Sequence, residues 1–328
     1  MLILVKKIFF ALLTLTLFLV IITGCKKEEE NLVIGILQTV DHPTLATTYQ
    51  GIIDQIAAYN FQNEKPINLI NLGIEKGQLI NKDSPAGNDS QDYLKDLDLI
   101  IAISSRSLYD ISQIENEFPI VFTAVSNPAN VYSNYPTSQK GKILSGVSDM
   151  IPIEDQFKLL KKLLPSLQRV GVIYNPAEKL SSSQIELIKS LEEAYNLTCL
   201  YQTVDSSAAA IDAAKNMLGE IDALYVPSDL TVTPVIQDMT IWTDLANKPI
   251  VSGDERGIEQ GALCTVVVDY YKLGKQTGTL AIKAINQKIL LENQPVEKSK
   301  HNRIMINIDT AAKLNIKVPS DLEQNAKD

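Results

Sequence analysis

The sequence of 328 residues has few of the groups on which enzyme chemistry depends. It contains two histidines, His42 and His301, three cysteines and one tryptophan. It has no phosphate-binding loop, no GxGxxG after its first apolar run, no HExxH and no CxxC pair. We therefore expect no cofactor and no metal, and we expect a binding protein rather than an enzyme.

Basic residues are also scarce relative to acidic ones. The chain has 30 Lys and Arg residues against 39 Asp and Glu residues, and two of the basic residues, Lys6 and Lys7, lie in an N-terminal segment that is expected to be removed. The 28 that remain leave the mature chain with a net charge of −11. A nucleic-acid-binding surface needs an excess of positive charge, and so does binding to anionic lipids. Neither partner is expected.

The longest apolar run is too short to cross a membrane as a helix. Ile8 to Ile22 provides 15 residues, whereas a spanning helix requires about 20. Lys6 and Lys7 precede the run and Gly24 follows it. A basic start, a short apolar stretch and a small residue before the cleavage site are typical of a secretory signal.

The residues after this run resemble a bacterial lipobox. They read Ile22-Thr23-Gly24-Cys25, and in such signals the cysteine thiol is lipidated and becomes the first residue of the mature protein. The resemblance implies a signal peptide over 1–24, lipidation of Cys25 and a charged tether over 25–30. A plain signal peptide with an incidental cysteine is the alternative.

The two remaining cysteines, Cys199 and Cys264, both lie in apolar runs. This placement favours buried free thiols. A disulfide between them is the alternative, but it is less favoured because two thiols do not define a disulfide framework.

The rest of the chain alternates between short apolar runs and helical stretches. The expected strands are 32–38, 67–72, 97–104 and 119–125, followed by a second series at 143–148, 169–174, 197–204, 223–226 and 249–253. The expected helices are 45–60, 107–116, 153–164, 183–195, 208–218 and 234–246. Such alternation predicts an α/β fold with two doubly wound parallel sheets, Rossmann-like in layout.

Small polar and acidic residues follow the strands of both series. In open α/β sheets ligands bind outside the carboxyl ends of the strands. We therefore expect two facing lobes that close on a small polar solute. The candidate ligand-binding residues are His42, Thr123, Ala124, Ser126, Asp149, Tyr174, Asn175, Ser181, Ser182, Ser228, Asp229, Asp254, Asp269 and Tyr270.

Several of these candidates have a structural alternative. His42 and Ser126 are as well placed to cap a turn as to contact a ligand. Ser183, next to Ser182, forms a capping box with Glu186 and is expected to begin a helix. Asp229 and Asp254 are the strongest candidates, and Asp254 is the preferred partner of an ammonium group, because a charge-assisted bond offsets desolvation.

Two further pairs of readings also stay open. Asp269 either contacts the ligand or braces the hinge. Tyr174 and Tyr270 either stack on an aromatic ring or pack against their own lobe.

Six segments make the chain similar to the tryptophan/tyrosine ABC-transporter substrate-binding proteins. They read IGILQTVDHPTLATTYQGIIDQI, PIVFTAVSNPA, GVSDM, RVGVIYNPAEKLSSSQIELIK, VPSDLTVTPVI and SGDERGIEQGALCTVVVDYYKLGKQTG. The similarity covers nearly the whole mature chain. Leu230, where the family pattern suggests asparagine, the long loop 129–140 and the polar segment 77–92 depart from it.

This resemblance implies the type I periplasmic-binding-protein fold, with two lobes joined by a three-stranded hinge. Lobe one is expected to hold residues 31–146 and 269–293, and lobe two residues 147–268 and 294–328. The implied protein is a monomeric lipoprotein on the outer face of the cell membrane. It binds an amino acid, aromatic by resemblance, and delivers it to an ABC permease and its ATPase. A sensory module for a membrane kinase and a surface enzyme that uses the cleft carboxylates are the alternatives.

Overall fold

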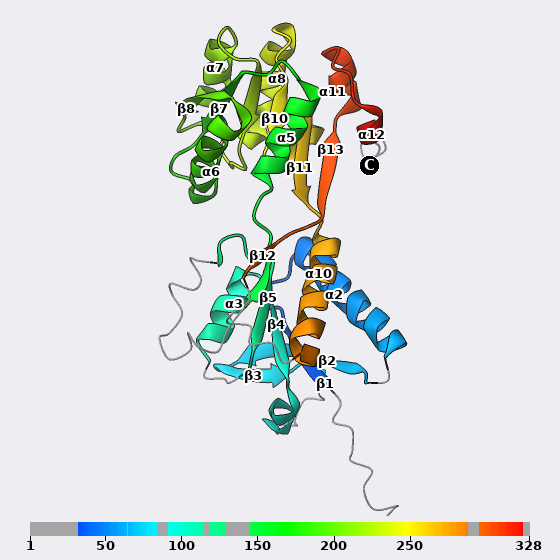
Figure 1. Cartoon of the computed structure of the whole chain (residues 1–328). Helices are drawn as coiled ribbons and strands as arrows, with labels where there is room; N and C mark the ends of the chain where they lie inside the picture. Colours follow the sequence, from blue (N-terminus) through cyan, green and yellow to red (C-terminus); the bar gives the residue numbers. More distant parts are fainter. Residues whose placement is uncertain are drawn as a thin grey trace, which may run out of the picture.

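The computed structural model describes residues 32–63, 65–83, 91–114, 118–128, 145–287 and 295–323. These residues form two α/β lobes that meet at a narrow waist, where the chain passes between them (Figure 1). Cys25 and the tether lie outside the described residues, as do the loop 129–140 and residues 84–90 of the polar segment. No helix in the described part of the chain is both long and apolar enough to span a membrane.

The first lobe is built on a seven-stranded sheet in the order β12-β6-β5-β4-β1-β2-β3. Its strands are β1 (Leu32–Leu37), β2 (Ile67–Glu75), β3 (Gln78–Asn81), β4 (Leu99–Ile103), β5 (Ile120–Thr123), β6 (Ser145–Ser148) and β12 (Glu297–Lys298). Every neighbouring pair is parallel except β2 and the edge strand β3. The central strand β4 is buried along its whole length, as expected of a parallel strand covered on both faces.

Helices cover both faces of this sheet. They are α2 (Pro43–Gln62), α3 (Ser105–Ser112) and α10 (Tyr270–Gln287), with a short 3₁₀ turn η1 (Gln91–Asp96). Ile52 of α2 and Leu273 of α10 belong to the core on one face, and Leu108 and Ile111 of α3 to the core on the other. Residue 270 follows β7 to β11 of lobe two in the sequence, so α10 brings the chain back to lobe one before β13 returns to lobe two.

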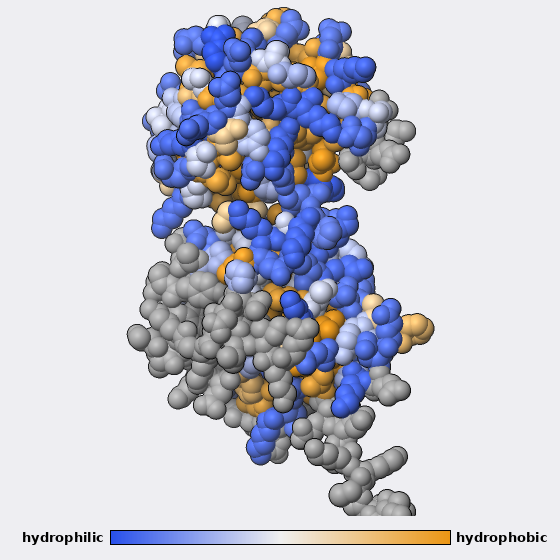
Figure 2. All heavy atoms as spheres, viewed as in Figure 1, coloured by the Kyte–Doolittle hydropathy of each residue, from blue (hydrophilic) through white to orange (hydrophobic). Residues whose placement is uncertain are grey.

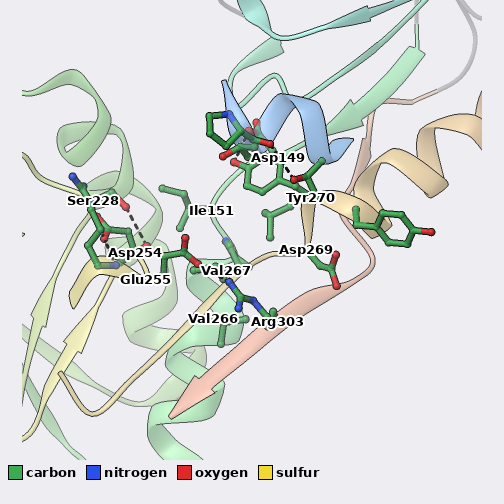
Figure 3. Close-up of a pocket in the computed structure, with 18 of the residues that line it drawn as sticks. Asp149, Ile151, Ser228, Asp254, Glu255, Val266, Val267, Asp269, Tyr270 and Arg303 are labelled. Carbon is green, nitrogen blue, oxygen red and sulfur yellow. Dashed lines mark hydrogen bonds and ion pairs between the residues drawn. The ribbon is translucent and has the colours of Figure 1, made fainter. Parts of the chain in front are cut away.

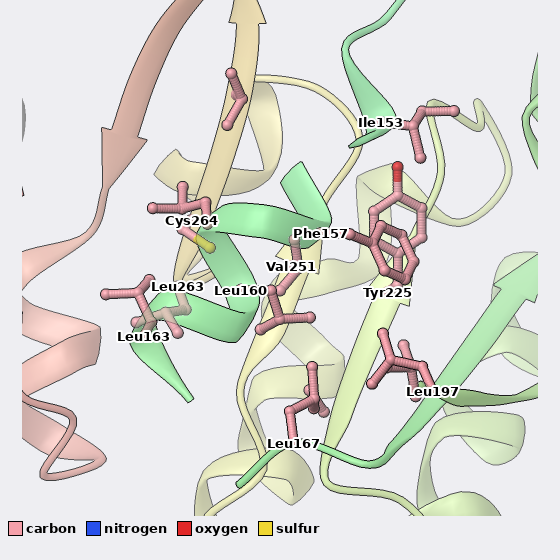
Figure 4. Packing of buried hydrophobic residues seen from close by; sticks show 14 of the residues in the cluster. Ile153, Phe157, Leu160, Leu163, Leu167, Leu197, Tyr225, Val251, Leu263 and Cys264 are labelled. Carbon is pink, nitrogen blue, oxygen red and sulfur yellow. The ribbon is translucent and has the colours of Figure 1, made fainter. Parts of the chain in front are cut away.

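The second lobe has a six-stranded sheet in the order β13-β11-β10-β9-β7-β8. Its strands are β7 (Arg169–Tyr174), β8 (Thr198–Thr203), β9 (Ala223–Val226), β10 (Ile250–Ser252), β11 (Cys264–Val268) and β13 (Asn302–Ile306), of which only β13 pairs antiparallel. Its helices are α5 (Ile153–Leu163), α6 (Lys179–Tyr195), α7 (Ser207–Met217), α8 (Ile236–Leu245), α9 (Arg256–Glu259), α11 (Ile308–Lys313) and α12 (Ser320–Glu323), with a 3₁₀ turn η3 (Thr233–Val235). Phe157 of α5 packs against Tyr225 of β9 with ring centroids 5.2 Å apart (Figure 4).

The α/β class and the two-sheet layout predicted from the sequence are confirmed, with three differences in detail. The strand expected at 143–148 appears as β6 and lies in the first sheet, beside β5, rather than opening the second series. Strand β12 also pairs with β6, so the last crossing to lobe two follows Lys298 rather than residue 293. The edge strands β3 and β13 and the inner strand β11 were not among the strands predicted from the apolar runs.

Helix α6 begins four residues before the predicted capping box. Its first residue is Lys179, so Ser183 lies inside the helix and donates a hydrogen bond to the carbonyl oxygen of Leu180 at 2.7 Å. The expected N-cap at Ser183 is therefore wrong, because local capping chemistry does not reveal how far a helix extends upstream.

Both described cysteines are free thiols in the core of lobe two. Burial raises the pKa of Cys199 to about 12, with the nearby carboxylate of Glu192 adding to the shift. Burial alone raises the pKa of Cys264 to about 12. The prediction of buried, unpaired cysteines is confirmed.

The contact between α2 and α10 depends on glycine. A side chain at Gly51 would overlap the carbonyl oxygen of Tyr271, and one at Gly274 would overlap the carbonyl oxygen of Thr48. Backbone atoms inside two helices cannot swing aside as the end of a flexible side chain can. The absence of a Cβ atom at both positions is what lets the two helices approach this closely.

Gly274→Ala should therefore destabilise the protein by about 1–3 kcal/mol, the usual cost of overpacking a core. Gly219→Ala is the matched control, because a Cβ atom at Gly219 meets nothing within 4 Å and should change stability by less than about 0.5 kcal/mol. Urea unfolding of both variants measures the difference. Equal stability of the two would contradict the close helix contact.

Candidate ligand-binding cleft

A cavity of about 910 Å³ lies between the two lobes. Figure 3 shows Asp149 and Tyr270 on one side of it and Ser228, Asp254 and Glu255 on the other. Its lining comes from the start of α2, the crossover after β6, the end of β10, and the junction of β11 with α10. The residues are His42, Pro43, Thr44, Thr47, Asp149, Ile151, Pro152, Leu180, Ser228, Gly253, Asp254, Glu255, Arg256, Val266, Val267, Val268, Asp269, Tyr270, Tyr271 and Arg303.

Asp149 follows β6 directly and is held by two hydroxyl groups. The Oγ of Ser126 donates to its Oδ1 at 2.9 Å, and the phenol of Tyr270 donates to its Oδ2 at 3.1 Å. Burial raises the pKa of the Asp149 carboxyl, and these two hydrogen bonds oppose the shift without cancelling it. The pKa of Tyr270 is raised as well, first by burial and then by the neighbouring Asp149 carboxylate.

The wall from lobe two carries two ion pairs. Asp254 Oδ1 accepts hydrogen bonds from the backbone N–H and the Nε of Arg256, and Asp254 Oδ2 lies 2.8 Å from an Arg256 amino nitrogen. Next to this pair, Glu255 binds Arg303 at 2.5 Å. Arg256 keeps 54% of its side chain exposed, so its guanidinium remains accessible from the cavity.

Two of the predicted residues combine a structural role with a place in the lining. His42 caps α2, since its Nδ1 accepts the backbone N–H of Thr44 at 3.2 Å, so the capping reading is confirmed. Asp269 accepts the backbone N–H of Lys272 at 3.0 Å and pairs with the Lys272 ammonium at 3.3 Å. Its own N–H donates to the carbonyl of His301, so it braces the point where two crossovers meet.

Asp229 does not line the cavity. It is 1% exposed, and its carboxylate accepts the backbone N–H groups of Asn175 at 2.7 Å, Thr231 at 2.9 Å and Val232 at 3.0 Å. Asn175 is occupied in the same way, because its side-chain amide donates to Thr231. These residues fix the strand-end loops of lobe two, and local sequence could not distinguish this role from ligand binding.

Other predicted ligand-binding residues also contact their own lobe rather than the cavity. Thr123 is fully buried and accepts a hydrogen bond from Thr277 at 2.8 Å. Ala124, with φ +54°, is buried, and Tyr174 packs on the core of lobe two. Ser181 and Ser182 donate to the carbonyls of Asn175 and Pro176.

Ser126 reaches the cleft only through Asp149. The predicted residues that do line the cavity are His42, Asp149, Ser228, Asp254, Asp269 and Tyr270.

The basic side of the cleft was not predicted from the sequence. Glu255 and Arg256 follow Asp254 directly, so their position after a strand was the available signal. Arg303 comes from β13, a strand that was not predicted, so no sequence pattern placed it here.

The cavity combines charges of both signs with apolar side chains. Ile151, Leu180 and Val266 supply apolar surface, and Asp149, Arg256 and Arg303 supply charge. Such a lining suits a small amphoteric solute with an apolar part. Among the described residues, no three His, Cys, Asp or Glu side chains gather as metal ligands would.

The chain matches the model of a known protein family along almost all of the sequence that follows the N-terminal segment. The model of the ABC transporter substrate binding protein family matches residues 33–328. The chain belongs to this family. Its members bind small-molecule substrates outside the cytoplasm for ABC transporters, which agrees with a cleft between two lobes. The type I periplasmic-binding-protein fold expected from the sequence is confirmed.

Individual relatives support the same assignment. The chain is 29% identical over 294 residues to the tyrosine-binding protein of Clostridioides difficile (strain R20291), covering 88% of this chain and 82% of the relative.

Two solved structures are also similar. The ligand-free, open structure of a Clostridium difficile substrate-binding protein with adhesive properties has a TM-score of 0.71 at 27% identity, covering 90% of this chain and 97% of that one. A Streptococcus pneumonia ABC domain in complex with L-Trp has a TM-score of 0.54 at 24% identity, covering 90% and 99%.

Asp229→Ala tests the structural role of that carboxylate in this receptor. The change leaves buried N–H groups of the 174–176 and 229–232 loops without an acceptor, which should cost about 2–5 kcal/mol of stability. Asp212→Ala is the control, because the Asp212 side chain is 74% exposed and should contribute less than about 0.5 kcal/mol. Thermal unfolding measures both. A variant at Asp229 that keeps its stability but loses ligand affinity would instead place this residue in the binding site.

Proposed function

We propose that this protein is the extracytoplasmic receptor of an ABC importer for an aromatic amino acid: tyrosine, tryptophan or phenylalanine. The observation that carries the proposal is the cleft itself, in which carboxylate, guanidinium and apolar side chains line one cavity. An amino acid has an ammonium group, a carboxylate and a side chain that match these three features. The named ligand of the tyrosine-binding relative supports an aromatic side chain.

Ligand capture by this receptor requires the two lobes to close. Three chain segments connect them, after β6, between β11 and α10, and between β12 and β13. Such short connections favour a rigid-body rotation, in which the lobes keep their internal packing. The similarity to an open, ligand-free relative supports reading the present arrangement as the open form. The closed form would then present a joint surface of both lobes to the permease.

The receptor is held at the outer face of the cell membrane by a lipid on Cys25. The lipobox motif and the charged residues Lys26 to Glu30 support this part of the proposal. A tethered receptor stays close to its permease, because tethering raises the effective concentration of the two partners. The acidic character of the chain is compatible with an anchor of this kind, since the lipid rather than basic side chains provides the attachment.

Calorimetric titration of the chain from Lys26 onward against the twenty amino acids tests the ligand. We expect an aromatic amino acid to bind about fivefold more tightly than leucine, because contact with an aromatic side chain such as Tyr270 adds about 1 kcal/mol beyond the area buried. If none of the twenty binds, the proposed ligand class is wrong.

Replacement of the cysteine in the lipobox tests the anchor. Cys25→Ser removes the thiol that would carry the lipid, so the protein should leave the membrane fraction when expressed in a bacterium that processes lipoproteins. Cys199→Ser is the control, because Cys199 is buried in lobe two, and it should stay with the membrane. Immunoblots of the membrane and soluble fractions compare them. A Cys25→Ser protein that remains in the membrane fraction would contradict lipidation at this residue.

A further inference from the structure

The four carboxylates that line the cavity differ in what compensates their charge. Asp254 pairs with Arg256, Glu255 with Arg303 and Asp269 with Lys272, at distances of 2.5 to 3.3 Å. Asp149 pairs with no basic side chain among the described residues. Its two hydrogen bonds come from neutral hydroxyl groups.

Of these four carboxylates, Asp149 is the one whose charge would be stabilised most by a nearby cation. Asp149 is half-buried, and a carboxylate partly removed from water without a nearby positive charge keeps its charged form at a free-energy cost, which neutral donors repay only in part. The raised pKa of Asp149 has burial as its first cause, and no Lys or Arg contributes to it. A cationic group that entered the cleft would remove this cost. The same cation would stabilise Asp254 and Glu255 less, because water and their arginine partners already compensate their charges.

The position of Asp149 suits a group that binds first to lobe one. Ser126 follows β5 and Tyr270 begins α10, so both donors belong to lobe one and hold the carboxylate on that side. In Figure 3, Asp149 and Tyr270 lie across the cavity from Asp254 and Glu255. Arg256 belongs to this opposite wall, and 54% of its side chain is exposed. A negative site and a positive site therefore face the same cavity from different lobes.

We propose that Asp149 binds the α-ammonium group of the ligand and that Arg256, positioned by Asp254, binds the ligand's α-carboxylate from lobe two. This inference rests on the proposed function as an amino-acid receptor, and it names the two residues that determine specificity for the zwitterion. Ser126 and Tyr270 act as positioning residues, because each contacts Asp149 and orients its two oxygens. A ligand that bridges Asp149 and Arg256 would also hold the lobes together.

This assignment replaces Asp254, the residue preferred from the sequence, as the ammonium partner. Both Asp254 oxygens already accept hydrogen bonds from Arg256. A ligand ammonium would have to break a bidentate pair to bind there, and would leave Arg256 without its partner. At Asp149 no ion pair is lost among the described contacts.

A cycle of two protein variants and two ligands isolates the contact. L-tyrosine is compared with 3-(4-hydroxyphenyl)propionate, which has the same ring and carboxylate but no amino group. Asp149→Asn keeps the size of the side chain and an oxygen for the Ser126 or Tyr270 hydroxyl. It should weaken L-tyrosine binding about a hundredfold and change binding of the deaminated compound less than about threefold.

Asp254→Asn is the matched comparison within the full chain. Because it disturbs Arg256 rather than the ammonium site, it should weaken both ligands by a similar factor. Calorimetry gives the dissociation constants, and thermal unfolding without ligand confirms that each variant is folded. Asp149→Asn should unfold at no lower temperature than the unchanged protein at neutral pH, since it removes a half-buried charge that has no basic partner among the described residues.

Proton release gives a second readout that does not depend on a variant. The Asp149 carboxyl must be ionised to bind an ammonium group, and its pKa is raised, so affinity for L-tyrosine should fall as the pH is lowered from 7 toward that pKa. Titrations at the lower end of this pH range, where part of the free Asp149 carboxyl carries a proton, in two buffers of different ionisation enthalpy should show protons released with L-tyrosine and not with the deaminated compound. The other charged or titratable groups around the cavity are His42, Asp254, Glu255, Arg256, Asp269, Tyr270, Tyr271 and Arg303. Loss of the release in Asp149→Asn assigns it to Asp149.

The outcomes separate this inference from the proposed function. If the unchanged protein binds L-tyrosine and Asp149→Asn binds it equally well, the inference is wrong and the receptor function stands. The same conclusion follows if only Asp254→Asn loses the preference for the amino group. If the unchanged protein binds no amino acid, the proposed function fails and the inference fails with it.

Discussion

The close contact between α2 and α10 is the constraint on which the rest of the structure depends. After building most of lobe two, the chain returns to lobe one as α10, and glycines at 51 and 274 let the two helices meet backbone to backbone. This contact fixes the start of α10, where Tyr270 lies, relative to the start of α2, where His42 lies. The lobe-one wall of the cleft is therefore built from segments more than 200 residues apart.

The start of α10 also joins the three segments that cross between the lobes. Asp269 caps the first turn of α10 and also donates its N–H to His301, so the second and third crossovers are joined to each other. Asp149 ties the first crossover to α10 through Tyr270. Rotation of the lobes must then move all three crossovers together. Figure 2 shows the molecule narrowing between the two lobes.

The carboxylates in the cleft differ in whether a basic side chain pairs with them. Three of the four carboxylates in the lining have a basic partner, and the fourth, Asp149, has only neutral donors among the described residues. A receptor that compensated every charge internally would gain little from a zwitterionic ligand, because each new contact would replace an existing one. At a carboxylate without a basic partner, a ligand's ammonium group neutralises the negative charge as it binds.

The sequence by itself determined the fold class, the two sheets and the positions at which strands end, because buried parallel strands appear as short apolar runs and their ends carry polar residues. It also indicated the thiols as free and located six of the residues that line the cleft. Tertiary structure alone decided which strand-end carboxylates face the cavity. Asp229 and Asp254 both follow strands of lobe two, yet one accepts three backbone N–H groups in the interior and the other pairs with Arg256 at the surface of the cleft. That difference depends on the approach of loops from elsewhere in the chain, as does the arrival of Arg303 on the edge strand β13, and no local pattern contains it.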